Sequence, residues 1–509
     1  MIIILDCGSQ LTLNIARRIR EHNVFCEIIP FDSDTDSIKG KKPDGIVISG
    51  GPANINEPGA PLVDKSIFGL GIPVLGICYG MQCMGKLLGG AVDSGSTREF
   101  GKAELMIKDK ENPLFSGLPD SFNVWMSHGD SVSVLPTGFS CAANSSGIEN
   151  ASIWDSKRSL FGVQFHPEVD HTEHGRKILE NFIEACGCSR DWKMEDFIKL
   201  KIKEIKETVG DSIVIGGVSG GVDSTVASAI MYSAIGDRFS PIFINNGLLR
   251  KDEPEEVIDM FKSFFHNEPI YVDATEKFLS GLKGVSDPEE KRKIIGKVFI
   301  EVFSDEAKRQ SDAKFLMQGT LYPDVIESTP VFGGPSSTIK SHHNVGGLPK
   351  DMHLKLIEPF RYLFKDEVRK IGEILGLPKT AIWRHPFPGP GLAVRILGEI
   401  TKPKLEVLRK ADHIFIEELE RSGEYYNIWQ AFSVLLPVKS VGVMGDERTY
   451  ENAVVLRAVT SNDTMTADWA KLPYKVLETT SGRIINEVKG INRVAYDISQ
   501  KPPATIEWE

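Results

Sequence analysis

The segment Pro73-Val-Leu-Gly-Ile-Cys-Tyr-Gly80 combines a short apolar run with two glycines that flank a cysteine. The pattern predicts a buried strand, a tight turn at Cys78 and then a helix. Small residues on both sides let the backbone turn sharply and lift the thiol above the end of the strand. A helix that begins near Tyr79 favours the thiolate through its dipole. The segment therefore indicates an α/β fold that carries a nucleophilic cysteine.

Comparable apolar runs recur on the N-terminal side of this segment. A helix is predicted at 11–20, where apolar residues return every three to four positions. Short, continuously apolar strands with helices between them are typical of a parallel sheet that is covered on both faces. The first 188 residues are therefore predicted to form one α/β domain. Its predicted strands include 2–5, 25–29, 45–48 and 74–77.

The alternation of strands and helices resumes in a second region, 189–384. The proline- and glycine-rich segment from His385 to Gly391 cannot be helical and marks the end of this region. Beyond it helices and strands are fewer and more segregated, which favours an α+β domain. The predicted fold class is α/β, with two consecutive parallel-sheet domains, 1–188 and 189–384, followed by a smaller α+β C-terminal domain, 385–509. Strands in the second region are predicted at 212–218, 242–245, 270–273 and 314–318.

Composition and charge restrict the classes of protein to which the chain can belong. Of its 509 residues, 41% are hydrophobic and 25% are charged, a globular balance that suits two to four domains. The formal net charge of -11 argues against a nucleic-acid partner. Seven cysteines, all within the first 188 residues, argue against a disulfide framework. No apolar run is long enough to cross a bilayer and no export pattern is found, so a cytoplasmic protein without a membrane partner is expected.

A cysteine nucleophile needs a base and a group that orients the base. His166 and Glu168 follow a predicted strand and, being two residues apart, can point the same way. Ser49-Gly-Gly-Pro52 follows another strand, and its backbone N–H groups are suited to an oxyanion hole. A structural role explains Cys78 better when that residue is considered alone. The three features together favour catalysis.

A second candidate site is the string Ser219-Gly-Gly-Val-Asp-Ser224, which lies between a predicted strand and a predicted helix. Consecutive glycines let backbone N–H groups face an anion, and the helix N-terminus adds positive potential. Because Asp223 repels a phosphate unless a cation lies between them, we predict that it coordinates Mg²⁺. No Gly-Lys-Ser/Thr follows, so this is not a Walker A loop, and it suits a held pyrophosphate with attack at the α-phosphorus. The alternative is a glycine turn capped by Asp223, which the full six-residue string disfavours.

These two sites, in this order, resemble the glutamine-hydrolysing GMP synthetase family. Gly-Ile-Cys78-Tyr-Gly and Gln-Phe-His166-Pro-Glu168 look like a class I glutamine amidotransferase, and 219–224 looks like an ATP pyrophosphatase domain. The resemblance covers essentially the whole chain. The strings most specific to the family are 318–328, 341–349, 385–392 and the terminal Lys501-Pro-Pro-Ala-Thr-Ile-Glu-Trp-Glu509.

The resemblance implies a reaction and its partners. ATP adenylates the C2 oxygen of xanthosine 5′-monophosphate and releases pyrophosphate, and ammonia from glutamine then displaces AMP to give GMP. Mg²⁺ is the implied cofactor, with ATP as co-substrate. The C-terminal domain is implied to join two copies of the chain in a homodimer.

The resemblance also implies a role for each matching residue. The implied catalytic triad is Cys78, His166 and Glu168, with oxyanion donors at Gly51 and Tyr79. The implied nucleotide contacts are Ser219, Gly220, Gly221, Val222, Asp223, Ser224 and Thr225 for the ATP phosphates, Gly319 near the adenine, and Arg292, Lys501 and Glu507 for the acceptor nucleotide.

A few residues stay open or depart from the family pattern. Lys365 is either an ATP-phosphate contact or a solvated helix residue. His128 either lines the glutamine pocket or caps a loop. Cys7 and Leu11 stand where the family usually has aromatic residues beside Gly-Ser-Gln, and Phe161 stands where tryptophan is common.

Two rival functions are weighed against this hypothesis. One is another pyrophosphate-releasing ligase or a tRNA-thiolating enzyme, but the acidic charge and the lack of any cysteine after Cys188 count against tRNA thiolation. The other is a non-catalytic protein that has kept the fold. The presence of Cys78, His166, Glu168 and Asp223 argues against it.

Overall fold

A computed structural model of the chain describes residues 1–310, 312–328, 354–444, 446–461 and 466–509, with the backbone alone at 94–97, 327–328 and 444. The string 341–349 lies outside the described residues. The chain divides into two compact units, one built mainly from Met1–Asp196 and the other from Phe197–Asp324 and the described residues after 353. The predicted division into three domains stays a prediction.

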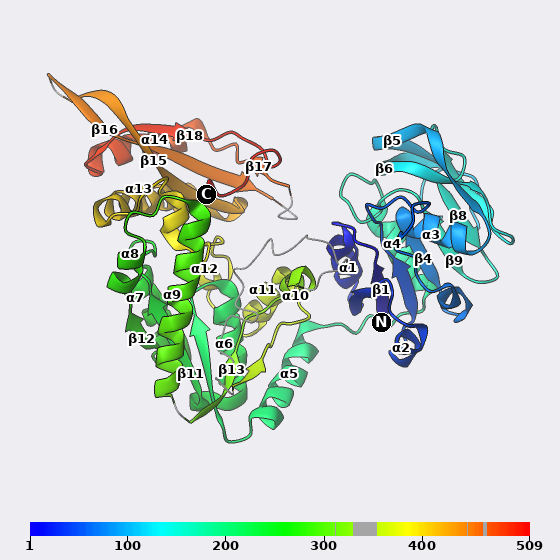
Figure 1. Cartoon of the computed structure of the whole chain (residues 1–509), viewed down its shortest axis with the longest axis horizontal. Helices are drawn as coiled ribbons and strands as arrows, with labels where there is room; N and C mark the ends of the chain where they lie inside the picture. The colour runs from blue at the N-terminus through cyan, green and yellow to red at the C-terminus, as the bar shows by residue number, and fades with distance from the viewer. Residues whose placement is uncertain (311, 329–353, 445, 462–465) are drawn as a thin grey trace. The chain divides into compact units, whose positions relative to one another are not determined.

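The first unit is a mixed sheet with helices packed against it (Figure 1). Its strands pair in the order β2-β1-β3-β4-β9-β8-β7-β5-β6, parallel from β2 to β9 and antiparallel from β9 to β6. Helix α1 packs against α4, and α3 packs against β3, β4 and β9. The elements are β1 (Ile2–Asp6), α1 (Thr12–Glu21), β2 (Cys26–Pro30), α2 (Thr35–Gly40), β3 (Gly45–Ile48), β4 (Val74–Ile77), α3 (Tyr79–Leu87), β5 (Ala91–Ile107), β6 (Ser121–Val134), β7 (Ser140–Ser145), β8 (Ser152–Asp155), β9 (Leu160–Val163) and α4 (Gly175–Ala185).

The parallel half of this sheet follows directly from its sequence. Every residue of β1, β3 and β4 is buried, as expected for short apolar strands covered on both faces. The antiparallel half was not predicted in detail. Strand β6 alternates exposed and buried residues over most of its length, because one face of this ribbon contacts the core and the other faces solvent.

The second unit begins with a parallel sheet in the order β12-β11-β10-β13-β14. This confirms the second predicted α/β region. Helix α6 packs against β10 and β11, and α9 also packs against β11 (Figure 1). The elements are α5 (Met194–Val209), β10 (Ile213–Val218), α6 (Val222–Ile235), β11 (Phe239–Asn245), α7 (Glu253–Met260), β12 (Ile270–Asp273), α8 (Thr275–Gly281), α9 (Pro288–Arg309), β13 (Ala313–Met317), α10 (Tyr322–Ser328), β14 (Lys355–Ile357), α11 (Lys365–Ile374) and α12 (Lys379–Ile382).

The same unit ends in a predominantly antiparallel sheet, which confirms the predicted α+β region. Strands β15 and β16 form a long hairpin, β17 pairs with the end of β16, and β18 runs parallel to β16. One hydrophobic core extends from Ile215 in β10 to Ile491 in β18, so the parallel sheet and this final sheet share buried surface. The elements are α13 (Lys402–Arg421), β15 (Gln430–Met444), β16 (Glu447–Thr460), β17 (Asp468–Trp469), α14 (Tyr474–Glu487) and β18 (Ile491–Tyr496).

The hairpin of β15 and β16 is longer than the sequence predicts. Apolar runs in the sequence predict strands only near 430–436 and 453–458. The outer part of the hairpin lacks such buried runs, and Val438, Val441, Val443 and Tyr450 are exposed on it. A register shift between Leu435 and Lys439 separates the buried part of β15 from its exposed part. Among the residues that the structure describes, none of the helices has the length and apolar character needed to cross a membrane.

The packing of α3 on the sheet gives a testable prediction about Gly80. A Cβ at Gly80 would lie 2.2 Å from the backbone oxygen of Ile48, so Gly80→Ala should destabilise the first unit by about 1–3 kcal/mol or more. Gly296 in α9 is the matched control, because a Cβ there meets nothing within 4 Å and alanine is the better helix former. Scanning calorimetry of the full chain should show a lower melting transition for Gly80→Ala only. Equal melting of Gly80→Ala and the unmodified chain would contradict this packing.

Candidate active sites

The first site is built on the sharp turn between β4 and α3. Cys78 has a φ of +51° and a ψ of -106°, a strained conformation for a residue with a side chain. Its backbone N–H donates to the oxygen of Val163 in β9 at 2.7 Å, which holds the turn against the neighbouring strand. A Cβ at Gly76 would lie 2.6 Å from the backbone of Gly80. Glycine at both flanking positions is therefore what allows the predicted nucleophile elbow to form.

His166 lies just past the end of β9 and forms a pair with Glu168. The distance from His166 Nδ1 to Glu168 Oε1 is 2.8 Å, and both side chains are buried. The backbone of His166 is fixed on both sides, since its N–H donates to the oxygen of Trp125 at 3.0 Å and its oxygen accepts from Thr172 Oγ1 at 2.6 Å. The imidazole is therefore held in one orientation.

The surroundings of His166 favour its charged form. Burial lowers the pKa of His166, but the charge of Glu168 and hydrogen bonds with Cys78 and Glu168 outweigh burial, so the pKa lies well above the usual 6.5. The structure thus brings together all three predicted triad residues. Cys78 Sγ also lies 3.7 Å from the oxygen of Ser127 and accepts a contact of 3.5 Å from Gln164 Nε2.

The predicted oxyanion residues lie beside this triad. A Cβ at Gly50 would lie 3.3 Å from His166 Cε1, and one at Gly51 would lie 3.4 Å from the Tyr79 ring and 2.7 Å from the oxygen of Cys7. The glycine loop after β3 therefore passes close to both the imidazole and the start of α3. Tyr79 is the first residue of α3, where a backbone N–H has no acceptor within the helix.

His128 is buried in β6, and its hydrogen-bond partners are residues outside the triad. Its Nδ1 donates to the oxygen of Asp130 at 3.1 Å, and its Nε2 lies 3.3 Å from Glu99 Oε2. Burial lowers the pKa of His128, although Glu99 partly offsets this effect. Both ring nitrogens are thus engaged by protein groups, which favours a structural role over a direct contact with substrate.

The second site lies where β10 ends and α6 begins. Gly220 has a φ of +71°, a left-handed conformation that favours glycine. The loop is tied across its base, because the Ser219 N–H donates to Ser224 Oγ at 3.3 Å and the Gly221 N–H donates to Ser219 Oγ at 3.3 Å. Val222 is the first residue of α6, and the Thr225 hydroxyl within its first turn is buried without a hydrogen bond.

Asp223 sits in the first turn of α6 with one carboxylate oxygen engaged. Lys365 Nζ donates to Asp223 Oδ2 at 3.2 Å, whereas Asp223 Oδ1 is buried without a hydrogen bond. A Cβ at Gly319 would lie 3.5 Å from the backbone carbon of Asp223, so Gly319 lies against this turn. Lys365 is therefore part of the site rather than a solvated helix residue.

The donors around Asp223 fit a Mg²⁺ ion that is shared with a substrate. Within the described residues, no three histidine, cysteine or carboxylate side chains are grouped as a complete metal cage. Mg²⁺ commonly binds through one or two carboxylates and completes its shell with phosphates and water. The free oxygen of Asp223 meets that requirement.

Of the three predicted acceptor residues, Lys501 and Glu507 lie in the C-terminal segment and Arg292 lies in α9. Arg292 in α9 donates to the backbone oxygen of Glu509. Glu507 accepts from Arg395 Nη2 at 2.9 Å and from Gln430 Nε2 at 2.7 Å. The backbone of Lys501 pairs with Ala467 at the edge of the final sheet. Arg292 thus contacts Glu509, two residues beyond Glu507.

Comparisons with known proteins find relatives that match the chain along its whole length. Residues 3–186 match the class-I glutamine amidotransferase family, and residues 417–508 match the GMP synthase C-terminal domain family. The chain is 57% identical to the GMP synthase [glutamine-hydrolyzing] of Brachyspira hyodysenteriae, over 100% of this chain and 99% of that protein. The proteins of the same name from Carboxydothermus hydrogenoformans and Aquifex aeolicus are 56% and 57% identical, with the same coverage. The chain belongs to the glutamine-hydrolysing GMP synthase family.

Membership of the GMP synthase family confirms the predicted reaction class, a glutamine-dependent carbon–nitrogen ligation that yields GMP. It also sets aside the tRNA-thiolating and non-catalytic alternatives, because the matches cover the chain from end to end. The roles of individual residues rest on the geometry above.

Several residues at these GMP synthase sites were missed by sequence reasoning. Gln164 lies two residues before His166 in the same string, and this spacing was the available signal for its contact with Cys78. Arg395 and Gln430 bind Glu507 from positions 112 and 77 residues away, so no local pattern could reveal them. Arg384, next to the predicted boundary, contacts the phosphate loop through Gly220.

The Glu168 contact predicts how His166 should titrate. Glu168→Gln removes the charge that favours the imidazolium, so the pKa of His166 should fall and the ring should lose its proton at lower pH than in the unmodified protein. Glutamine hydrolysis should fall roughly 10²- to 10⁴-fold, as when the orienting carboxylate of a triad is neutralised. Histidine NMR titration and a glutaminase assay measure the two effects.

Asp170→Asn is the control for this experiment. Asp170 is an exposed carboxylate two residues further on that pairs with Arg18 at 2.7 Å. Its loss should leave both the His166 titration and glutamine hydrolysis nearly unchanged. If Glu168→Gln left the titration midpoint of His166 in place, the assigned cause of the raised pKa would be wrong.

Proposed function

We propose that this GMP synthase frees ammonia from glutamine at Cys78. The observation that carries the proposal is the buried His166–Glu168 pair, which lies beside a cysteine on a strained turn. His166 holds the proton of the thiol as an imidazolium, and the Cys78 thiolate attacks the amide carbon of glutamine. The C–N bond then breaks, ammonia leaves with the proton returned by His166, and water hydrolyses the remaining thioester to glutamate.

Backbone N–H groups stabilise the oxyanion that forms during this attack. Gly51 and Tyr79 are the proposed donors, because the glycine loop lies beside the imidazole and the Tyr79 ring, and Tyr79 directly follows the thiol-bearing Cys78. Such donors are fixed before the substrate arrives, so no reorganisation is required when negative charge develops.

The second site is proposed to activate the acceptor nucleotide with ATP. The C2 oxygen of xanthosine 5′-monophosphate attacks the α-phosphorus, the bond to pyrophosphate breaks, and ammonia then attacks C2 and displaces AMP. The backbone of Ser219–Thr225 holds the leaving pyrophosphate at the N-terminus of α6, and Lys365 adds positive charge beside it. Gly319 lies against the same turn and is proposed to border the adenine.

Mg²⁺ is the proposed cofactor, held by Asp223 together with the phosphates of ATP. When bound, the ion neutralises charge on the departing pyrophosphate. Asp223 presents a buried oxygen with no hydrogen bond, and Lys365 fixes the other oxygen of the same carboxylate.

The acceptor nucleotide is proposed to bind along the C-terminal segment. Arg292 and Lys501 suit its phosphate, and the carboxylate of Glu507 suits purine N–H groups. Arg395 and Gln430 support this assignment, because they fix the orientation of Glu507 with contacts of 2.9 Å and 2.7 Å.

We further propose a cytoplasmic homodimer that acts on small molecules, with no nucleic-acid or membrane partner. The seven cysteines are present as free thiols, which suits a reducing compartment. The exposed Val441, Val443 and Tyr450 on the β15–β16 hairpin offer apolar surface for a second copy of the chain. A sedimentation experiment that shows only monomer at micromolar concentration would contradict the dimer.

Substitution of Cys78 separates the two half-reactions. Cys78→Ala should abolish GMP formation from glutamine, because no thiolate remains, and should spare GMP formation from free ammonium. Cys83→Ala is the matched control, since Cys83 is buried in α3, where burial raises its pKa to about 11. With ammonium, AMP and pyrophosphate should each appear in equal amount with GMP. Loss of the ammonium reaction in Cys78→Ala would contradict the proposed division of work.

Substitution of Asp223 tests the ATP site and its Mg²⁺ ion. Asp223→Asn should reduce GMP formation from both glutamine and ammonium by at least about 10²-fold, because a neutral amide is a poor ligand for Mg²⁺. The apparent Mg²⁺ requirement should rise in the same variant. Asp211→Asn, an exposed carboxylate just before β10, is the control. An unchanged Mg²⁺ dependence in Asp223→Asn would rule out the assigned coordination.

A further inference from the structure

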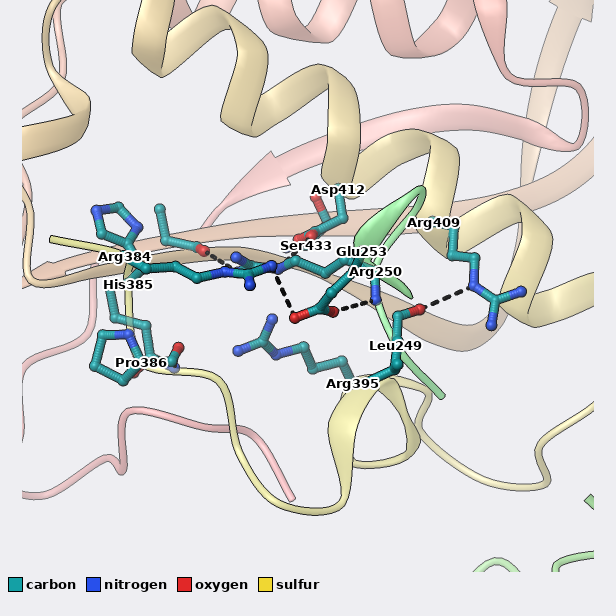
Figure 2. A network of polar contacts seen from close by, with 12 residues as sticks. Leu249, Arg250, Glu253, Arg384, His385, Pro386, Arg395, Arg409, Asp412 and Ser433 are labelled. Carbon is teal, nitrogen blue, oxygen red and sulfur yellow. Dashed lines mark hydrogen bonds and ion pairs between the residues drawn. The ribbon is translucent and has the colours of Figure 1, made fainter. Parts of the chain in front are cut away.

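Arg384 lies between the phosphate loop and the segment that begins at His385. Its Nη1 donates to the oxygen of Gly220 at 3.4 Å, and its Nη2 lies 2.8 Å from Glu253 Oε1 in α7. The Glu253 side chain is only 3% exposed. Its second oxygen, Oε2, accepts from the backbone N–H of Arg250 at 2.8 Å, so one buried carboxylate joins Arg384 to the loop after β11 (Figure 2).

Arg384 contacts the phosphate loop at Gly220, the residue of the loop whose backbone has a left-handed conformation. Gly220 has a left-handed φ, and a Cβ there would lie 2.3 Å from Val257 Cγ2 and 3.3 Å from Arg384 Nη1. The peptide is thus confined between α7 and the guanidinium of Arg384. A shift of Arg384 changes the hydrogen bonding of the loop that is proposed to hold pyrophosphate.

Arg384 also has space into which it can move. Its side chain is 17% exposed and borders a cavity of about 190 Å³, which Trp383 and Trp429 also line. The pairing with Glu253 and the contact with Gly220 are therefore one arrangement of a side chain that is not fully enclosed.

The other end of the same network reaches the C-terminal sheet. Arg250 Nε lies 3.1 Å from Asp412 Oδ2 in α13, and Asp412 Oδ1 accepts from the Ser433 N–H in β15 at 2.8 Å (Figure 2). Arg250 Nη2 also donates to the oxygen of Ala431 at 3.2 Å. The loop after β11, which carries Arg250, is therefore anchored to α13 and to β15 of the C-terminal sheet.

A ring in the proline-rich segment links this network to the proposed acceptor site. The guanidinium groups of Arg250 and Arg395 each lie 5.1 Å from the centroid of the Phe387 ring. Arg395 is fully buried and binds Glu507 through two nitrogens, at 2.9 Å and 3.2 Å. A nucleotide that binds Glu507 would compete with Arg395 for this carboxylate. Arg395 and Arg250 both contact the Phe387 ring, so a change at Arg395 can reach Arg250.

We propose that Arg384 is a positioning residue that holds the phosphate loop in its ATP-binding conformation and conveys to it the occupancy of the acceptor site. The connection runs through Glu253, Arg250 and Phe387 to Arg395. The proposal rests on the function proposed above for the loop and for Glu507. It implies that the acceptor nucleotide tightens the binding of ATP before any chemistry takes place, which limits the use of ATP when no acceptor is present.

A purely structural ion pair is the alternative, and the choice of variants separates the two. Removing one member of a buried pair leaves an uncompensated charge and destabilises the fold whatever its function. Arg384→Lys keeps a positive charge opposite Glu253. The single ammonium group of lysine cannot contact Glu253 and Gly220 together, as the two terminal nitrogens of arginine do. The double variant Arg384→Gln, Glu253→Gln removes both charges together.

Binding of α,β-methylene-ATP with Mg²⁺ to the full chain provides the measurement, because this analogue cannot release pyrophosphate. Titration calorimetry is performed with and without saturating xanthosine 5′-monophosphate. The unmodified chain should bind the analogue several-fold more tightly when the acceptor is present. Both variants should bind it about tenfold more weakly, a change of about 1.4 kcal/mol, and should lose the effect of the acceptor.

Steady-state rates with saturating ammonium complete the test, since they do not require the glutaminase site. The KM for ATP should rise about tenfold in both variants, while kcat at saturating ATP changes less than about twofold. Arg421→Gln, which removes an exposed guanidinium paired within α13, should behave like the unmodified chain.

The contrary outcomes are distinct. Analogue affinity in Arg384→Lys equal to that of the unmodified chain, or restored affinity in the double variant, would reduce the pair to a structural role and overturn the proposal. The absence of any acceptor effect in the unmodified chain would overturn the link to Glu507. If the unmodified chain did not bind the analogue at all, the proposed function of the loop would fail instead.

Discussion

Both sites depend on the parallel pairing of short, fully buried strands. In the first unit β4 pairs with β9, Ile77 opposite Val163, so the residues that follow the two strands emerge side by side. Those residues are Cys78 on one strand and His166 on the other. In the second unit β10 pairs with β13, Gly216 opposite Met317, and the same geometry brings the phosphate loop next to Gly319. Carboxyl ends of parallel strands lie at one edge, so each site is assembled by backbone hydrogen bonds before any side chain contributes.

This dependence explains what could be predicted from the sequence. An apolar run followed by Gly-Ile-Cys78-Tyr-Gly specifies a strand, a turn and a helix, and His166 follows another such run. Because both strands are buried on both faces, their pattern is continuous and easily recognised. The tight turn also predicted small residues at Gly76 and Gly80. The structure agrees, because a Cβ at either position would lie 2.6 Å or less from backbone atoms.

The parts that could not be predicted are those made by contacts between distant segments. Among the antiparallel strands, β6 alternates exposed and buried residues, whereas β7 and β8 do not. The pairing of these strands with one another and with β5 is therefore not visible in any single stretch of sequence. Glu507 was assigned by resemblance alone, and its partners Arg395 and Gln430 became evident only in the folded chain. Likewise, the fixed orientation of His128 depends on Glu99, which the sequence places 29 residues away.

Buried charges at these sites are satisfied only in part, and this incompleteness has a physical consequence. Glu168 Oε2 and Asp223 Oδ1 are both buried without a hydrogen bond, although their second oxygens are engaged by His166 and Lys365. An unsatisfied buried carboxylate oxygen destabilises the fold, and at Glu168 and Asp223 it lies next to a group that is proposed to act in the reaction. The proposed ATP site adds a further constraint, because the contact from Lys365 must be shared with or exchanged for contacts to phosphate and Mg²⁺. The free energy of binding is then the difference between the Lys365–Asp223 contact in the empty site and the contacts of Lys365 with phosphate and Asp223 with Mg²⁺ in the filled site. This difference favours a ligand that brings both phosphate and Mg²⁺.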